Sequence, residues 1–353
     1  MTPSLRITVV GPISGGSLSV AAASTRAFMA LGHTTTFIDN TVHAPALTAL
    51  RSAPVPDDER QKREVDLFLR AADETQRAVC ESKPQLVLYL AQAPVLLSRH
   101  TEPLRERDVP SVFWFVEDFR VFTYWQRAAE RYDHVWAIQQ DPFLSLLRKK
   151  GVRYVDFVPL ACESPTFANP EGFAAGDITF VGSAYPNRVK LLNEIEEPRL
   201  RLFGPGFARH AKLSPLVAVD GVLPHEQLAP IFAQSRINLN LSSTANPELF
   251  TERKDFLNPR AFEICAAGGF QLVERLLPLE GFFVPEREVA TFLGPEEAAE
   301  KLRYFMANDS ERRAIAEKGQ VRALSHHTYK ARLAAALERL MQADGDRVLA
   351  ASW

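Results

Sequence analysis

Two adjacent carboxylates, Glu117 and Asp118, follow an apolar stretch in the first half of the chain. The preceding residues 111–116 are apolar at nearly every position, which is typical of a strand buried on both faces of a parallel sheet. The pair therefore lies at the carboxyl end of a strand, where α/β folds bind ligands. We expect Asp118, with Glu117 second, to accept a proton from a hydroxyl group as a general base. A solvated pair, or an acidic first turn of a helix, explains these residues equally well, because carboxylates at the start of a helix interact favourably with its dipole.

The second charged segment begins at Asn258, which is typical of a helix N-cap, followed by Pro259 at the first helical position. Arg260 then lies in the first turn, where the dipole also favours an anion such as a diphosphate. Glu263 shares a face with Arg260, and a carboxylate beside a phosphate site can accept both hydroxyls of a ribose. The helix ends at Gly268, which allows close packing on the next strand. A capped amphipathic helix with an i,i+3 ion pair is the alternative.

A third segment places Gly182 and Ser183 at the end of a predicted strand, with Arg188 in the first turn of the helix that follows. A backbone N–H, a hydroxyl and a guanidinium would then converge as they do around a phosphate. Asn187 is expected to begin this helix as an ordinary cap.

Weaker signals lie elsewhere in the chain. Gly15 and Gly16 let the backbone turn after the first strand and approach a ligand, but their spacing is not that of a dinucleotide fingerprint, so a plain turn is equally open. His225 begins a helix and could contact the base of a nucleotide. The sequence has no H-E-x-x-H, G-x-S-x-G or Walker motif and no Asp-x-Asp spacing at the end of a predicted strand, and we expect no metal site.

The elements that must position these residues alternate between apolar strands and helical patterns, which predicts doubly wound α/β domains. Strands are expected at 5–11, 34–39, 85–91, 111–117, 134–139, 154–160, 177–182, 200–204, 217–220, 237–242, 270–274 and 289–293. Helices are expected at 17–32, 63–82, 125–132, 142–150, 187–196, 225–235, 259–268, 295–307 and 311–342. A mobile loop is expected at 50–62.

The length of 353 residues also predicts two domains, at 1–165 and 166–353, joined by a polar linker at 163–176. The last helix is longer than the second domain needs, so it is expected to cross back onto the first.

The composition narrows the function classes. Apolar residues make up 46% of the chain and charged residues 24%, and the net charge is −2, so a nucleic-acid-binding role is not expected. The three cysteines are far apart and show neither metal-ligand spacing nor a disulfide framework, which favours a reducing compartment. The most apolar internal stretch, 86–97, is too short to span a bilayer. With no signal peptide at the start, we expect a cytoplasmic protein.

Six segments in the second half carry a family resemblance: Phe180-Val181-Gly182-Ser183, Leu202-Phe203-Gly204, Leu223-Pro224-His225-Glu226-Gln227-Leu228, Ile237-Asn238-Leu239-Asn240-Leu241, Arg260-Ala261-Phe262-Glu263 and His327-Thr328-Tyr329. In order and spacing they resemble the CgeB-like (spore-maturation) branch of GT-B glycosyltransferases over about 177–335.

The resemblance implies two Rossmann-like domains facing a cleft, with a nucleotide-sugar donor on the C-terminal domain and an acceptor on the N-terminal domain. It implies metal-independent transfer without a cofactor, and a uridine diphosphate sugar is the first choice of donor. Glu263 matches the family glutamate expected on the donor ribose, and Arg260 sits where a diphosphate contact is expected. Asn258 and Pro259 depart from the family, which often has glycine there.

The expected function is therefore transfer of a sugar from a nucleoside diphosphate to a hydroxyl on a protein, a glycan or a small molecule. A nucleotide-sugar epimerase of similar architecture and a catalytically silent nucleotide-sugar-binding subunit are the alternatives. Dehydrogenase chemistry comes last, because the first loop lacks the dinucleotide spacing.

Overall fold

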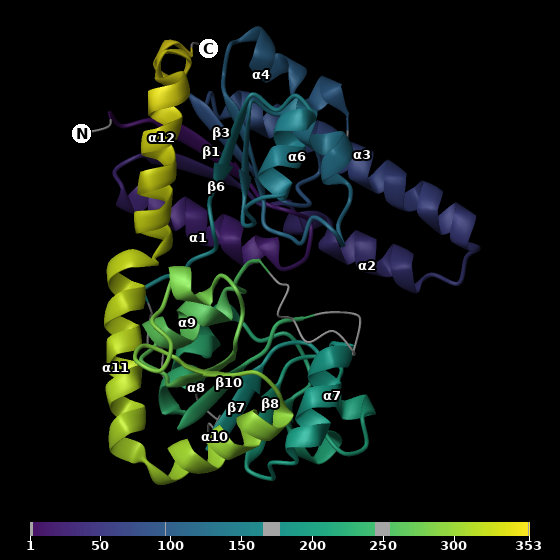
Figure 1. Cartoon of the computed structure of the whole chain (residues 1–353). Coiled ribbons are helices and arrows are strands. Elements are labelled where there is room, and N and C mark those ends of the chain that lie inside the picture. Colours follow the sequence, from purple (N-terminus) through teal and green to yellow (C-terminus); the bar gives the residue numbers. More distant parts are fainter. Residues whose placement is uncertain (1–2, 96, 165–176, 244–254, 352) are drawn as a thin grey trace. The chain divides into compact units, whose positions relative to one another are not determined.

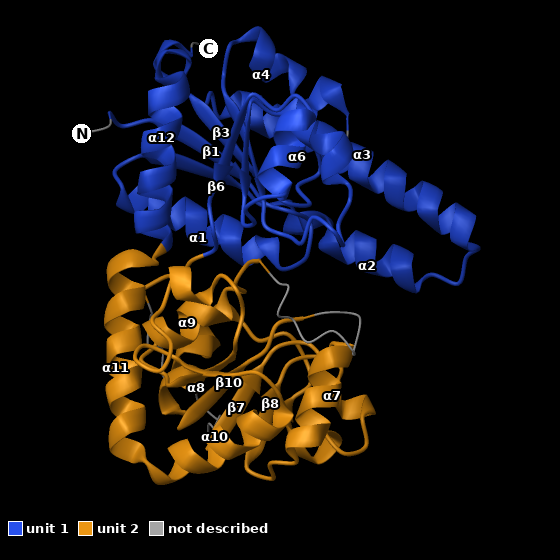
Figure 2. Ribbon diagram, in the orientation of Figure 1, with its two compact units in different colours: residues 1–160, 329–353 blue, residues 161–328 orange. Residues whose placement is uncertain are grey.

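The computed structural model describes residues 3–95, 97–164, 177–243, 255–351 and 353. It divides the chain into two compact units, Met1–Leu160 with Tyr329–Trp353 (unit 1) and Ala161–Thr328 (unit 2), coloured separately in Figure 2. Each unit contains a six-stranded parallel sheet flanked by helices, so the predicted α/β class and its Rossmann-like domains are confirmed. The predicted linker at 163–176 lies almost wholly outside the described residues.

The sheet of unit 1 has the strand order β2-β1-β3-β4-β5-β6, and all of its pairs are parallel. Its strands are β1 (Arg6–Val10), β2 (Thr34–Ile38), β3 (Leu86–Leu90), β4 (Ser111–Phe115), β5 (His134–Ala137) and β6 (Tyr154–Phe157). The chain goes from β1 outward to β2 and then returns to the other side of β1 for β3. The strand order therefore reverses between β1 and β3, which is where an open α/β sheet forms its ligand crevice.

Helices cover both faces of this sheet (Figure 1). They are α1 (Ser17–Ala30), α2 (Ala44–Ser52), α3 (Asp57–Glu81), α4 (Glu102–Glu106), α5 (Trp125–Ala128), α6 (Phe143–Lys149) and α12 (Tyr329–Ala350). On one face, Phe113 and Phe115 of β4 join a buried cluster with Val79 of α3 and Phe143 of α6. On the other, Trp114 packs edge-on against Tyr329 of α12.

The predicted mobile loop at 50–62 is wrong. Helix α2 continues to Ser52, and α3 already begins at Asp57 after Pro56. The acidic residues Asp57, Asp58 and Glu59, from which a loop was predicted, form the first turn of α3. Their carboxylates interact favourably there with the positive end of the helix dipole.

The single helix predicted at 311–342 is also wrong, because the chain forms α11 (Asp309–His326) and α12 with a break between them. Helix α12 lies beside α1 in Figure 1. Leu333 on α12 is fully buried, and Ala351 joins the core of unit 1. Tyr329–Trp353 therefore belongs to unit 1, whereas the predicted second domain included it.

Unit 2 has the strand order β12-β11-β10-β7-β8-β9. Its strands are β7 (Ile178–Val181), β8 (Leu200–Phe203), β9 (Val217–Val219), β10 (Ile237–Asn240), β11 (Gln271–Glu274) and β12 (Ala290–Phe292). Its helices include α7 (Pro186–Ile195), α8 (Leu228–Gln234), α9 (Arg260–Ala266), α10 (Pro295–Ala307) and α11. All twelve predicted strands are thus present, each shorter than predicted by a few residues at most. In unit 2 the order reverses between β7 and β10.

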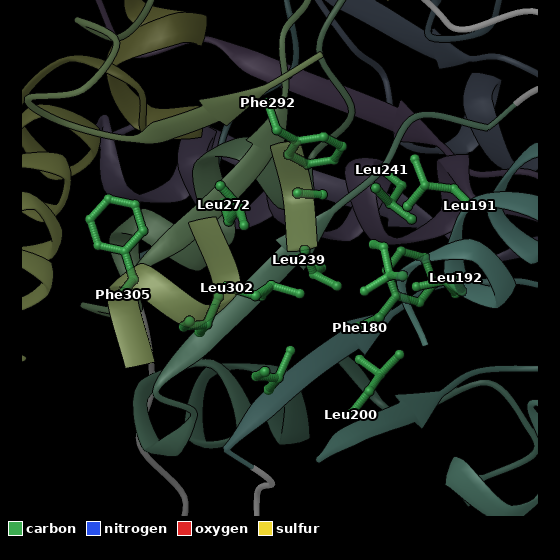
Figure 3. Close-up of a cluster of buried hydrophobic side chains, with 14 of the residues drawn as sticks. Phe180, Leu191, Leu192, Leu200, Leu239, Leu241, Leu272, Phe292, Leu302 and Phe305 are labelled. Carbon is green, nitrogen blue, oxygen red and sulfur yellow. The ribbon is translucent and has the colours of Figure 1, made fainter. Parts of the chain in front are cut away.

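Apolar side chains bury both faces of the unit 2 sheet. Figure 3 shows one face, where Phe180 of β7 and Leu239 of β10 pack against Leu192 of α7 and Leu302 of α10. On the opposite face a smaller cluster joins strand residues to α8 and α9. Asn258, just before α9, donates to Asn240 at the end of β10, so the first turn of α9 lies beside the carboxyl end of that strand.

Candidate functional site

Three loops meet at the carboxyl edge of the unit 1 sheet. Gly15 follows β1, Gln92 follows β3 and Glu117 follows β4, and these three strands are neighbours. Gly15 has φ +107°, and a Cβ atom there would lie 2.8 Å from Oε1 of Gln92. A side chain at Gly15 would therefore displace Gln92. Gly16 stands at the start of α1, and a Cβ atom at Gly16 would meet nothing within 4 Å.

The carboxylate of Glu117 accepts two side-chain hydrogen bonds. The hydroxyl of Tyr124 donates to Oε2 at 2.6 Å, and Nε2 of Gln92 donates to Oε1. The backbone N–H of Gln92 in turn donates to the Tyr124 hydroxyl at 3.1 Å. Burial raises the pKa of Glu117 above its usual range, although both hydrogen bonds act in the opposite direction. Sequence reasoning missed Gln92 and Tyr124, and the one available signal was a polar residue directly after an apolar strand.

Asp118 lies at the same edge but is bound differently. Its Oδ1 accepts from the backbone N–H of Arg120 at 3.0 Å, and from the side chains of Arg120 and Gln139 at 3.5 Å each. The first of these bonds closes an Asx turn, a motif in which the carboxylate stabilises the local chain. Asp118 therefore stabilises a turn of the backbone. Glu117 is the carboxylate whose pKa is raised by burial.

In unit 2, the start of α9 brings together three of the residues predicted for the donor, Asn258, Arg260 and Glu263. Arg260 forms an ion pair with Glu263, and their side chains are 28% and 11% exposed. Oδ1 of Asn258 accepts from the Ala261 N–H at 3.3 Å, while Nδ2 donates to Asn240 at the end of β10. The helix begins at Arg260, one residue later than predicted, and Asn258 still satisfies one of its first N–H groups. Since α9 has only 7 residues, the guanidinium is the main local positive charge.

His225 lies between two carboxylates of unit 2. Its Nε2 is 3.5 Å from Glu163, and its Nδ1 is 4.0 Å from Glu263. Two residues that were predicted separately, His225 and Glu263, are therefore neighbours. Sequence reasoning missed Glu163, because it placed this residue in the linker.

Arg188 lies at the reversal point of the unit 2 sheet, but its guanidinium is turned toward the backbone. It donates to the carbonyl oxygens of Leu241 at 2.7 Å, Ser183 at 3.1 Å and Ser242 at 3.3 Å. The residue is 8% exposed, and burial lowers its pKa to about 10. The sequence predicted that Arg188 and Ser183 converge around a phosphate. In the structure the Arg188 guanidinium instead donates a hydrogen bond to the backbone of Ser183. Asn187 does not begin the helix as predicted; α7 begins at Pro186, and Asn187 also donates to Ser242 at 2.9 Å.

The two predicted donor-site glycines differ in location. Gly182 follows β7, and a Cβ atom there would approach Nη1 of Arg188 to 3.0 Å. Gly268 follows the last turn of α9 with φ +77°, where a Cβ atom would lie 3.0 Å from Nε2 of Gln320. Gly268 therefore lies at the opposite end of α9 from Arg260. This end of the helix leads into the next strand, so it lies at the amino edge of the sheet, whereas Arg260 lies at the carboxyl edge.

Within the described residues, no group of three or more His, Cys, Asp and Glu side chains is placed to hold a metal ion. No helix in this part of the chain is both long enough and apolar enough to span a membrane.

Residues 187–338 match the family model of a glycosyl transferase-like domain. No curated protein matches the chain.

Several solved structures share the fold. Sucrose-phosphate synthase from Thermosynechococcus elongatus matches with a TM-score of 0.63 and 12% identity, covering 96% of this chain and 99% of that one. HepE from Anabaena, in complex with UDP-glucose, matches with a TM-score of 0.59 and 11% identity, covering 95% of this chain and 100% of that one. A protein from Listeria monocytogenes assigned as a UDP-N-acetylglucosamine 2-epimerase matches with a TM-score of 0.55 and 10% identity, covering 96% of each chain. The chain therefore has the fold of GT-B glycosyltransferases, and its residues 187–338 match the model of a glycosyl transferase-like family.

Proposed function

We propose that the protein is a glycosyltransferase that moves a sugar from a nucleoside diphosphate to a hydroxyl-bearing acceptor without a metal ion. The observation that carries the proposal is the pair of Arg260 and Glu263 in the first turn of α9. This pair lies inside the glycosyl transferase-like segment, at the carboxyl edge of a parallel sheet. Open α/β sheets bind their ligands at this edge.

The two side chains of this pair suit different parts of a nucleotide sugar. Arg260 presents a partly exposed guanidinium, whose forked N–H groups match phosphate oxygens. Glu263 offers a carboxylate that accepts hydrogen bonds from ribose hydroxyls. Transfer requires the diphosphate to depart with additional negative charge, and a fixed guanidinium stabilises that charge. This arrangement supports transfer without a metal ion.

Unit 1 supplies the acceptor side in this proposal. Glu117 and Asp118 follow a central strand of its sheet, and a carboxylate there takes the proton that the acceptor hydroxyl loses. The acceptor is a protein, a glycan or a small molecule, and we propose a uridine diphosphate sugar as the donor. The fold shared with a UDP-glucose-bound protein supports this choice.

A nucleotide-sugar epimerase is the second candidate, because the fold is also shared with a protein assigned to that activity. Both functions need the same donor site but give different products from the donor alone. An epimerase returns an isomerised sugar still attached to its nucleotide, whereas a glycosyltransferase releases the nucleoside diphosphate to water or to an acceptor.

The test is to incubate the whole chain separately with UDP-, GDP-, ADP-, CDP- and TDP-glucose, with and without EDTA, and to identify products by NMR and mass spectrometry. We expect one donor to release its nucleoside diphosphate, with no loss of rate in EDTA. An isomerised nucleotide sugar would replace the proposal by the epimerase, and loss of activity in EDTA would overturn metal independence. Donor binding without any product would indicate a silent binding subunit.

A further inference from the structure

We infer that Glu117 is the residue that takes the acceptor proton, and that Tyr124 and Gln92 are positioning residues that hold its carboxylate. This inference rests on the proposed function, because it names the proton acceptor of the same reaction. It reverses the order expected from sequence, which placed Asp118 first.

Glu117 lies near the ligand-binding edge of the unit 1 sheet. Glu117 and Gln92 come from the loops after β4 and β3, and Gly15 comes from the loop after β1. The strand order of unit 1 reverses between β1 and β3, so the cluster borders the point where such sheets bind ligands. Asp118, in contrast, accepts from Gln139 after β5, one strand farther from that point.

The backbone that presents the Gln92 side chain to Glu117 is strained. This residue has φ +65°, a left-handed conformation that few residues other than glycine adopt. Its neighbour Ala91 is fixed by hydrogen bonds to the Trp114 carbonyl at 3.0 Å and from the Ser17 hydroxyl at 2.8 Å. Strained backbone of this kind gathers at functional sites, where the surrounding structure holds it in place. The glycine at Gly15 leaves room for the Gln92 side chain to reach Glu117.

Burial and hydrogen bonding act on the pKa of the Glu117 carboxylate in opposite directions. Burial raises the pKa of Glu117, and the hydrogen bonds from Tyr124 and Gln92 lower it in part. On the loop of Glu117 itself, the charged side chains of Asp118 and Arg120 pair with each other. A carboxylate with a raised pKa accepts a proton more effectively near neutral pH than an ordinary one.

In the proposed step two bonds break and two bonds form. The acceptor O–H bond breaks and its proton moves to an oxygen of Glu117, while the acceptor oxygen forms a bond to the anomeric carbon. The bond from that carbon to the diphosphate breaks, and its electron pair leaves with the diphosphate. A carboxylate offers about four acceptor positions, and Tyr124 and Gln92 occupy two of them, so Glu117 retains capacity for a hydroxyl.

The first experiment measures UDP release from UDP-glucose, with water as the acceptor, together with UDP binding by calorimetry. We expect Glu117→Gln to lower the release rate by about 100-fold or more with unchanged UDP binding, because general bases contribute about 10²–10⁴-fold. Asp118→Asn should lower the release rate at least about tenfold less than Glu117→Gln does. The reverse pattern, or full activity in Glu117→Gln, would overturn the assignment. Absence of UDP binding in the wild type would count against the uridine donor and would leave the second experiment unaffected.

The second experiment needs no substrate and follows the carboxyl carbon of Glu117 by NMR of the ¹³C-labelled chain, with the signal assigned by its loss in Glu117→Gln. We expect the midpoint to lie above that of an ordinary glutamate and to rise further in Tyr124→Phe and in Gln92→Leu, because each variant removes a bond to the charged form. Where UDP-glucose is turned over, the acid limb of the pH–rate profile should move to higher pH in the same variants.

Unit 2 provides a matched control. The hydroxyl of Tyr304 donates to Glu311 at 2.6 Å, the same distance as in the Tyr124–Glu117 bond, but on an exposed surface. Tyr304→Phe should leave the Glu117 midpoint unchanged. An ordinary midpoint in the wild type, or no change in both Tyr124→Phe and Gln92→Leu, would overturn the positioning roles.

Discussion

Replacing the buried guanidinium of Arg188 by the apolar side chain of methionine should destabilise unit 2 even without a ligand. The carbonyl oxygens of Leu241 and Ser183 lose their close donors, while Ser242 keeps the bond from Asn187. A buried acceptor left without its partner costs about 1–3 kcal/mol. Relief of guanidinium burial offsets part of this cost, so we expect a loss of about 3 kcal/mol for Arg188→Met.

The four tryptophans make the assay specific, because all of them belong to unit 1. Urea unfolding followed by tryptophan fluorescence therefore reports on unit 1, while far-UV circular dichroism reports on both units. With a slope of about 2 kcal/mol per molar urea, the unit 2 midpoint should fall by roughly 1.5 M, and the fluorescence midpoint should not move.

Arg260→Met is the matched control, because Arg260 lies in the same unit but is partly exposed and holds one ion pair. Its stability should stay within about 1 kcal/mol of the wild type. An Arg188→Met protein with an unchanged unit 2 midpoint would refute the structural role of Arg188 and return it to the residues expected to contact phosphate.

Three further predictions concern unit 1. Gly15→Ala should lower UDP release from UDP-glucose about tenfold or more, because its methyl group would displace the Gln92 side chain; an unchanged rate would contradict this coupling. Burial lowers the pKa of His134 despite its contact with Asp344, so the folded state binds fewer protons than the unfolded state. Unfolding free energy should therefore fall as the pH drops below about 6.5, by up to about 1.4 kcal/mol per pH unit, and urea titrations of His134→Gln should show a shallower slope. Leu333→Ala should cost about 2–5 kcal/mol and speed hydrogen exchange in the unit 1 strands, whereas faster exchange in unit 2 alone would contradict the placement of α12.

The strands could be predicted because parallel strands buried on both faces read as continuous apolar runs. The location of the candidate site followed from the same pattern, since Glu117 and Gly182 come directly after such runs. Helix starts were harder to predict, because Pro56 and the acids after it suit a loop and a first turn equally well.

The partners of the site residues could not be predicted. Tyr124 contacts Glu117 because the loop after β4 folds back on itself, and Glu163 contacts His225 because the fold brings two distant segments together. The direction of the Arg188 side chain could not be predicted either. An arginine in the first turn of a helix can bind a phosphate or a backbone carbonyl, and the sequence does not distinguish the two.

Calorimetric titration of the whole chain with UDP, GDP, ADP, CDP and TDP tests the central claim most directly. We predict that one of the five diphosphates binds, and that Arg260→Met and Glu263→Gln each weaken its binding by about 10- to 100-fold, the value of a charged hydrogen bond. Arg313→Met, an exposed arginine paired with Asp309 on α11, should bind as the wild type does. Binding that is unchanged in both the Arg260 and Glu263 variants, or no binding of any diphosphate, would contradict the account.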